Sequence, residues 1–85
     1  MEYLFTFENT HEAIFAEKVL LAQKVAVRVM SLPSQIAAGC GICLRVNPSQ
    51  LKMVKQLMQQ NNIPYQAVYS AKKNEMGTEY TQCSR

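Results

Sequence analysis

Four short stretches of the chain alternate hydrophobic and polar positions, and each predicts a β strand. They are rich in β-branched and aromatic residues, which favour strands over helices. The four stretches are YLFTFE at 3–8, VAVRVM at 25–30, ICLRV at 42–46 and YQAVYS at 65–70. In the third stretch we expect Ile42 and Leu44 to face the core, because side chains alternate between the two faces of a strand. Cys43 and Arg45 are then expected on the opposite face, together with Arg28.

A helix is predicted after the first strand, where Asn9-Thr10 offers an N-cap. Apolar residues recur at helical spacing along AIFAEKVLLAQ, and this arc, which includes Phe15, is expected to pack in the core. Ile14 and Leu21, seven residues apart, form a smaller apolar spot on another side of the helix. That spot is either more core or a contact between two copies of the chain.

The second helix is predicted to begin at Asn47-Pro48 and to end near Asn61, with an apolar stripe facing the core. The resulting order, β-α-β-β-α-β, is that of the ferredoxin-like sandwich, an α+β fold. We therefore expect a four-stranded antiparallel sheet with both helices on one face and a second face that is open or paired with another copy. This single domain would span residues 1–70, and the polar residues 71–85 are expected to form a flexible C-terminal tail.

Composition and charge narrow the function classes. The 85 residues carry a formal net charge of +3, without a basic stripe interleaved with aromatic residues, so nucleic-acid binding is not expected. No apolar run approaches the roughly 18 residues of a membrane span, and the acidic start lacks the basic region of a signal peptide. We therefore expect a cytoplasmic protein. Three cysteines in such a reducing compartment are expected to be reactive or buried rather than cross-linked.

Cys40 stands between Gly39 and Gly41 at the point where a loop becomes the third strand. In the expected topology this loop and the start of the first helix lie at the same end of the sheet. A helix N-terminus carries a partial positive charge, which stabilises a thiolate and lowers its pKa. His11 would add positive charge when protonated, whereas Glu12 would oppose it. Cys40 is therefore a candidate nucleophile, with flanking glycines that let a partner protein reach the sulfur.

Other interpretations of the cysteines stay open. In the first, Cys40 is a structural residue of a tight turn, since cysteine is often buried as a small hydrophobe. In the second, Cys40 and Cys43 form a redox pair, although three extended residues span about 10 Å, beyond the roughly 7 Å that a disulfide allows. A zinc site would need Cys83 and His11 to join them. We expect neither a metal nor a cofactor.

Two blocks of sequence carry a family resemblance. The first is a proline loop that leads through Cys-Gly to an apolar strand ending in Arg-Val, with the residues Pro33, Ser34, Cys40, Gly41, Arg45 and Val46. The second lies in the first helix and comprises Thr10, His11, Glu12, Ala13 and Glu17. In these blocks the stretch 3–69 resembles the selenium/sulfur (Se/S) carrier protein-like family of small bacterial proteins. The resemblance implies that Cys40 carries sulfur or selenium.

The function implied by the resemblance is that of a small carrier that holds the chalcogen on Cys40 as a persulfide or selenosulfide. It would take the atom from a desulfurase- or lyase-type donor and pass it to an acceptor protein, without turnover of its own, so an enzyme is not expected. His11 would stabilise the thiolate, and Arg45 would meet an acidic partner surface. The supporting loop residues would be Thr10, Pro33, Ser34, Gly39 and Gly41. The alternative is a non-catalytic interaction module that dimerises through the open sheet face, with Cys40 as a turn residue.

Overall fold

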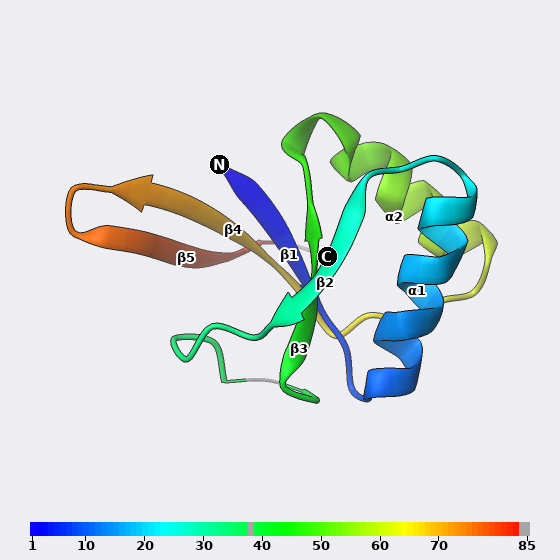
Figure 1. Ribbon diagram of the computed structural model, residues 1–85, viewed down its shortest axis with the longest axis horizontal. Helices are drawn as coiled ribbons and strands as arrows, with labels where there is room; N and C mark the ends of the chain where they lie inside the picture. The colour runs from blue at the N-terminus through cyan, green and yellow to red at the C-terminus, as the bar shows by residue number, and fades with distance from the viewer. Residues whose placement is uncertain (38, 84–85) are drawn as a thin grey trace.

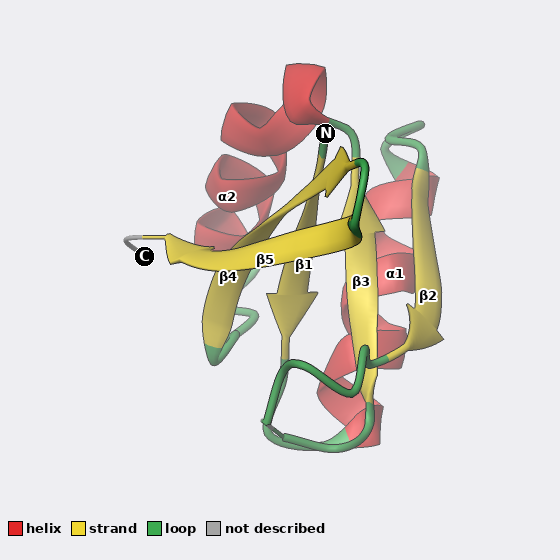
Figure 2. Cartoon of the chain, turned by 90° about the vertical axis from the view of Figure 1, so that its left-hand side faces the viewer, coloured by secondary structure: helices red, strands yellow, loops and turns green. Residues whose placement is uncertain are grey.

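A computed structural model describes residues 1–37 and 39–83 of the chain. Within these residues, two α-helices cover one face of a five-stranded antiparallel sheet (Figures 1 and 2). The elements are β1 (Glu2–Thr6), α1 (Thr10–Ala22), β2 (Val27–Ser31), β3 (Ile42–Val46), the 3-10 turn η1 (Pro48–Gln50), α2 (Leu51–Gln60), β4 (Ala67–Asn74) and β5 (Gly77–Cys83). The strands lie in the order β2-β3-β1-β4-β5. The broad α+β class predicted from the sequence is confirmed.

The C-terminal segment corrects the prediction of four strands followed by a polar tail. β4 continues to Asn74, and β5 pairs with it from Gly77 onward as a hairpin that extends beyond the rest of the sheet (Figure 1). The turn is closed by the amide of Met76, which donates to Asn74 Oδ1 over 2.9 Å. The sequence hid this strand because its pairing uses backbone groups, and few of its side chains are apolar. Residues 84–85 of the predicted tail lie outside the described residues.

The main core lies between the sheet and the two helices and is filled by Phe5, Phe7 and Leu20, among others. The prediction that Phe15 belongs to this core is wrong, because 46% of that residue is exposed. α1 turns the buried Ala16 toward the sheet, and a neighbouring residue points about 100° away around the helix axis. The exposed part of α1 also carries the apolar spot of Ile14 and Leu21, which the sequence left open between core and a contact between two copies, and its exposure excludes the core alternative.

A second, smaller apolar cluster lies on the sheet face away from the helices, and we call it the second-face cluster. Its buried members are Leu4, Ile36 and Cys43, and Met30, Leu32, Tyr69, Ala71 and Tyr80 pack partly against it. Cys43 points away from the helices, as the strand alternation predicts, but it is completely buried rather than open to solvent. The reason is that the segment after β2 brings Ile36 against it, so the open second face of the prediction is closed in part.

One backbone amide on the edge of β2 that faces away from β3 is bonded to a side chain of α1. The amide of Val29 donates to a carboxylate oxygen of Glu17 on α1 over 3.0 Å. This contact joins α1 to β2, an outer strand of the sheet, and it gives Glu17 a structural role that the sequence did not indicate.

Candidate functional site

The loop that carries Cys40 has a backbone that needs glycine on both sides of the cysteine. Gly39 has φ +56° and Gly41 has φ +85°, both in the left-handed region that side chains disfavour. The loop is closed where the amide of Leu32 donates to the carbonyl of Gly41 over 2.9 Å. Cys40 therefore lies in a turn with left-handed backbone on both sides, directly before β3.

Gly39 fixes the position of this turn against the end of β1. A Cβ atom added to Gly39 would lie 2.0 Å from the carbonyl oxygen of Phe7, so the two backbones touch closely enough to exclude any side chain. Asn9, two residues after Phe7, is the N-cap of α1. The turn before β3 consequently lies beside the start of α1 (Figures 1 and 2). This is the end of the sheet at which the sequence predicts Cys40.

Cys40 as a residue is partly exposed and packs partly against the main core. Its Sγ lies 3.8 Å from the carbonyl oxygen of Ile42, a weak contact within the same turn. At the start of α1, Asn9 Oδ1 already accepts the amide of Glu12 over 2.9 Å, so part of the helix terminus is occupied by its own cap. His11 is exposed, and within the described residues no hydrogen bond or ion pair joins it to Cys40.

Cys43 is buried, whereas Cys40 is partly exposed. Burial raises the pKa of the Cys43 thiol from an ordinary value of 9.0 to about 11, and the neighbouring charge of Cys40 adds to the shift. The Cys43 Sγ lies 3.9 Å from the carbonyl oxygen of Ser31. The two thiols belong to different apolar clusters, and both are free. Cys43 is thus an inert, packed thiol.

The raised pKa of Cys43 predicts that alkali destabilises the fold. The unfolded chain would lose the Cys43 proton near pH 9, whereas the folded chain holds it to about pH 11. Stability from this group is therefore complete below pH 9 and is lost as the pH rises to about 11, by up to roughly 2–3 kcal/mol. Urea unfolding of the natural chain and of Cys43→Ala at pH 8 to 11 measures this, and the extra decline should be absent in the variant. Equal declines would contradict the assignment.

Cys83 lies far along the chain from the other two cysteines, at the end of β5. It is half-buried, with its Sγ 3.7 Å from the carbonyl oxygen of Thr81. In the part of the chain that the structure describes, no three His, Cys, Asp or Glu side chains come together as a metal site. Cys40, Cys43, Cys83 and His11 are accordingly not assembled as the zinc alternative would require.

The remaining predicted residues separate into two places. Pro33 and Ser34 shape the segment after β2, where the carbonyl of Pro33 accepts the amide of Ile36 and turns Ile36 inward. Arg45 lies on the second face, where its Nε is 3.0 Å from a carboxylate oxygen of Glu2. Sequence reasoning missed Glu2, although strand alternation would have placed it on the face that carries Arg45.

Comparison with known proteins gives a family and one relative. Residues 2–70 match the family described as "Putative Se/S carrier protein-like". The chain is also 37% identical over 43 residues to the uncharacterized protein YtiA of Escherichia coli (strain K12), and that match covers 51% of each chain. The matching region therefore spans about half the length of this relative. No solved structure matches the chain. Among the described residues, no helix has the length and apolar character needed to span a membrane.

Proposed function

We propose, since this chain belongs to the Se/S carrier protein-like family, that it holds sulfur or selenium on Cys40 and relays the atom between partner proteins. One observation carries the choice of residue. Cys40 and Cys43 are the cysteines within the matched residues 2–70, and Cys43 is completely buried with a raised pKa. Cys40 is partly exposed on a turn, so it is the thiol that a partner protein can reach.

The transfer is a thiol exchange that needs no outside oxidant. The Cys40 thiolate attacks the terminal sulfur of a donor persulfide, R–S–SH. The new S–S bond gives Cys40–S–SH, the donor S–S bond breaks, and the donor leaves as the thiolate R–S⁻. An acceptor thiolate then attacks the terminal sulfur in the same way and releases the Cys40 thiolate. With a donor selenosulfide, R–S–SeH, selenium takes the place of the transferred sulfur, and the electron count is unchanged.

The surroundings of Cys40 suggest how its thiolate is stabilised and how partner proteins reach it. The amide end of α1 and a protonated His11 would favour the thiolate and the persulfide anion. The turn of Gly39 and Gly41 would present the sulfur to the donor's active site. The proposal includes a reducing, cytoplasmic location, because such a compartment keeps the Cys40 thiol available. Arg45 lies on the second face, so an acidic partner that uses it would also cover that face.

The test is sulfur loading followed by mass spectrometry. The protein is incubated with a cysteine desulfurase and cysteine, and one sulfur atom should be added to a peptide that contains Cys40. Cys40→Ser should abolish the gain because the accepting thiol is gone. Cys43→Ser and Cys83→Ser are the matched controls and should load as the natural chain does.

Two results would count against the carrier role. One is an unchanged mass with a donor that is active toward another acceptor. The other is an equal gain in Cys40→Ser, which would assign the sulfur to a different thiol and contradict the role of Cys40. An unchanged mass would favour the interaction module in which Cys40 serves only the turn.

A further inference from the structure

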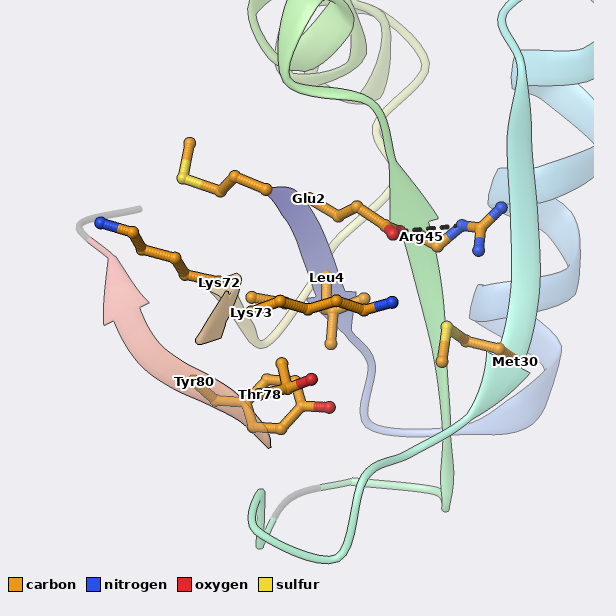
Figure 3. Close-up of a pocket in the computed structure, with 10 residues that line it drawn as sticks. Glu2, Leu4, Met30, Arg45, Lys72, Lys73, Thr78 and Tyr80 are labelled. Carbon is orange, nitrogen blue, oxygen red and sulfur yellow. Dashed lines mark ion pairs between the residues drawn. The ribbon is translucent and has the colours of Figure 1, made fainter. Parts of the chain in front are cut away.

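A pocket of about 570 Å³ lies on the second face, between the β4–β5 hairpin and β2 (Figure 3). We call it the second-face pocket. Its floor is apolar and includes Leu4, Met30 and Tyr80, which also belong to the second-face cluster. Pockets of roughly 300–1,000 Å³ with an apolar floor and a few polar groups are typical of small-molecule sites. The pocket thus has the size and the floor of a ligand site.

The rim of the second-face pocket is positively charged. Its lining includes the basic side chains of Arg45, Lys72 and Lys73 and one acidic side chain, Glu2. Figure 3 shows Lys73 extending across the pocket above Leu4, in the direction of Arg45. The pair of Glu2 and Arg45 is the only ion pair within the described residues, so Lys73 has no acidic partner there. An anion entering the pocket would therefore meet an unneutralised ammonium group.

The ion pair at the rim indicates what kind of group the pocket takes. Glu2 approaches Arg45 through one oxygen, 3.0 Å from Nε, whereas a guanidinium has five N–H donors in a planar fork. Both side chains are nearly half exposed, so the pair is weak and exchangeable. Arg28 lies directly opposite Arg45 on the neighbouring strand and adds a further positive charge beside it. The Glu2 carboxylate is thus already bound to Arg45, and the oxyanion of a ligand would replace this carboxylate.

We propose that the second-face pocket binds a small organic anion. Its carboxylate or phosphate group lies between Arg45 and Lys73, and its apolar body lies on Leu4, Met30 and Tyr80. The Glu2 carboxylate competes with the ligand for Arg45. The site lies on a different surface from the Cys40 turn, and it does not depend on the carrier role.

The test is a titration of the natural chain followed by NMR shifts, with phenylphosphate as the probe. Phenylphosphate should shift the amides of β1, β4 and β5 around the pocket. Benzyl alcohol, which lacks the charge, and inorganic phosphate, which lacks the apolar body, should each bind about tenfold more weakly. Comparison of benzoate with phenylphosphate separates carboxylate from phosphate preference. Inorganic phosphate binding as tightly as phenylphosphate would overturn the proposal, as would shifts only at other surfaces.

Variants make the geometry of the site falsifiable. Arg45→Gln should weaken phenylphosphate binding about five- to tenfold, and Glu2→Gln should strengthen it severalfold because the competing carboxylate is removed. Thr78 faces Lys73 across the hairpin. Thr78→Glu should block the site because it adds a carboxylate beside Lys73, whereas Thr78→Gln adds a side chain of the same size without the charge and should not block it. Lys18→Gln removes the same charge from the exposed side of α1 and should change nothing. Equal effects of Thr78→Glu and Thr78→Gln, or weaker binding in Glu2→Gln, would contradict the assignment.

Discussion

Gly39→Ala is expected to destabilise the fold by about 3 kcal/mol or more, whereas Gly41→Ala should lose only about 1–2 kcal/mol. Both positions have positive φ, so both variants bear the backbone strain of a left-handed alanine. Only at Gly39 does the added Cβ meet another backbone, 2.0 Å from the carbonyl oxygen of Phe7. At Gly41 no atom lies within 4 Å of the new Cβ. The two variants therefore separate a steric clash from conformational strain.

The clash at Gly39 has no simple way to relax. Phe7 is completely buried, and just before it the carbonyl of Thr6 accepts the amide of Gln66 over 2.7 Å. The end of β1 is thus held from both sides, and the Cys40 turn must move instead. Urea unfolding at neutral pH measures the two losses. Similar losses in both variants would mean that the turn is not seated on Phe7, and the location assigned to Cys40 would then lose its support.

Cys43 is expected to react with iodoacetamide at least about 100-fold more slowly in the folded chain than in the urea-unfolded chain. At pH 8, a thiol with a pKa of about 11 has roughly 100-fold less thiolate than one at the ordinary 9.0, and the thiolate is the nucleophile. Complete burial slows the reaction further, because the reagent cannot reach the sulfur. The measurement uses the variant with Cys40→Ser and Cys83→Ser, so that one thiol remains.

The matching variant that keeps only Cys40 is the control for this prediction. Cys40 is partly exposed, so folding should protect it far less than it protects Cys43. Protection of Cys43 below about tenfold would contradict its burial under Ile36. It would also reopen the interpretation in which Cys40 and Cys43 act together.

The elements with a strong hydrophobic period were predictable from the sequence. The 3-10 turn η1 begins at the predicted Asn47-Pro48 signal, and α2 follows it directly and ends next to the predicted Asn61. The alternation in β3 correctly separates Leu44 from Cys43. These predictions succeed because each depends on local chemistry, either a cap or a two-residue period.

The failures share a different cause, since each depends on how elements pack in three dimensions and not on a local pattern of side chains. β5 is polar, and it is held by backbone pairing with β4 and by Tyr80 on the second face. Cys43 is buried by Ile36, which belongs to a loop, where no periodic pattern of hydrophobic residues predicts burial. Phe15 has the spacing of a core residue, but the side of α1 that meets the sheet is selected by the small Ala16 beside it.

The candidate site was predictable as a thiol between glycines, and the packing of that turn was not. No pattern in the sequence reveals that Gly39 touches the carbonyl of Phe7, because the contact joins two loops that are 32 positions apart. The second-face pocket is also a product of tertiary structure, since Arg45, Lys73 and Glu2 come from three different strands.

The bond between Glu17 and the Val29 amide limits how copies of this chain can associate. A sheet grows by strand addition at its two outer strands, here β2 and β5. A strand arriving at β2 would have to displace the Glu17 carboxylate from Val29, whereas within the described residues no side chain of α1 bonds to β5. Endless fibres need two receptive edges on every copy. Strand addition at β2 would break the bond between Glu17 and Val29, which makes β2 the less receptive of the two outer strands.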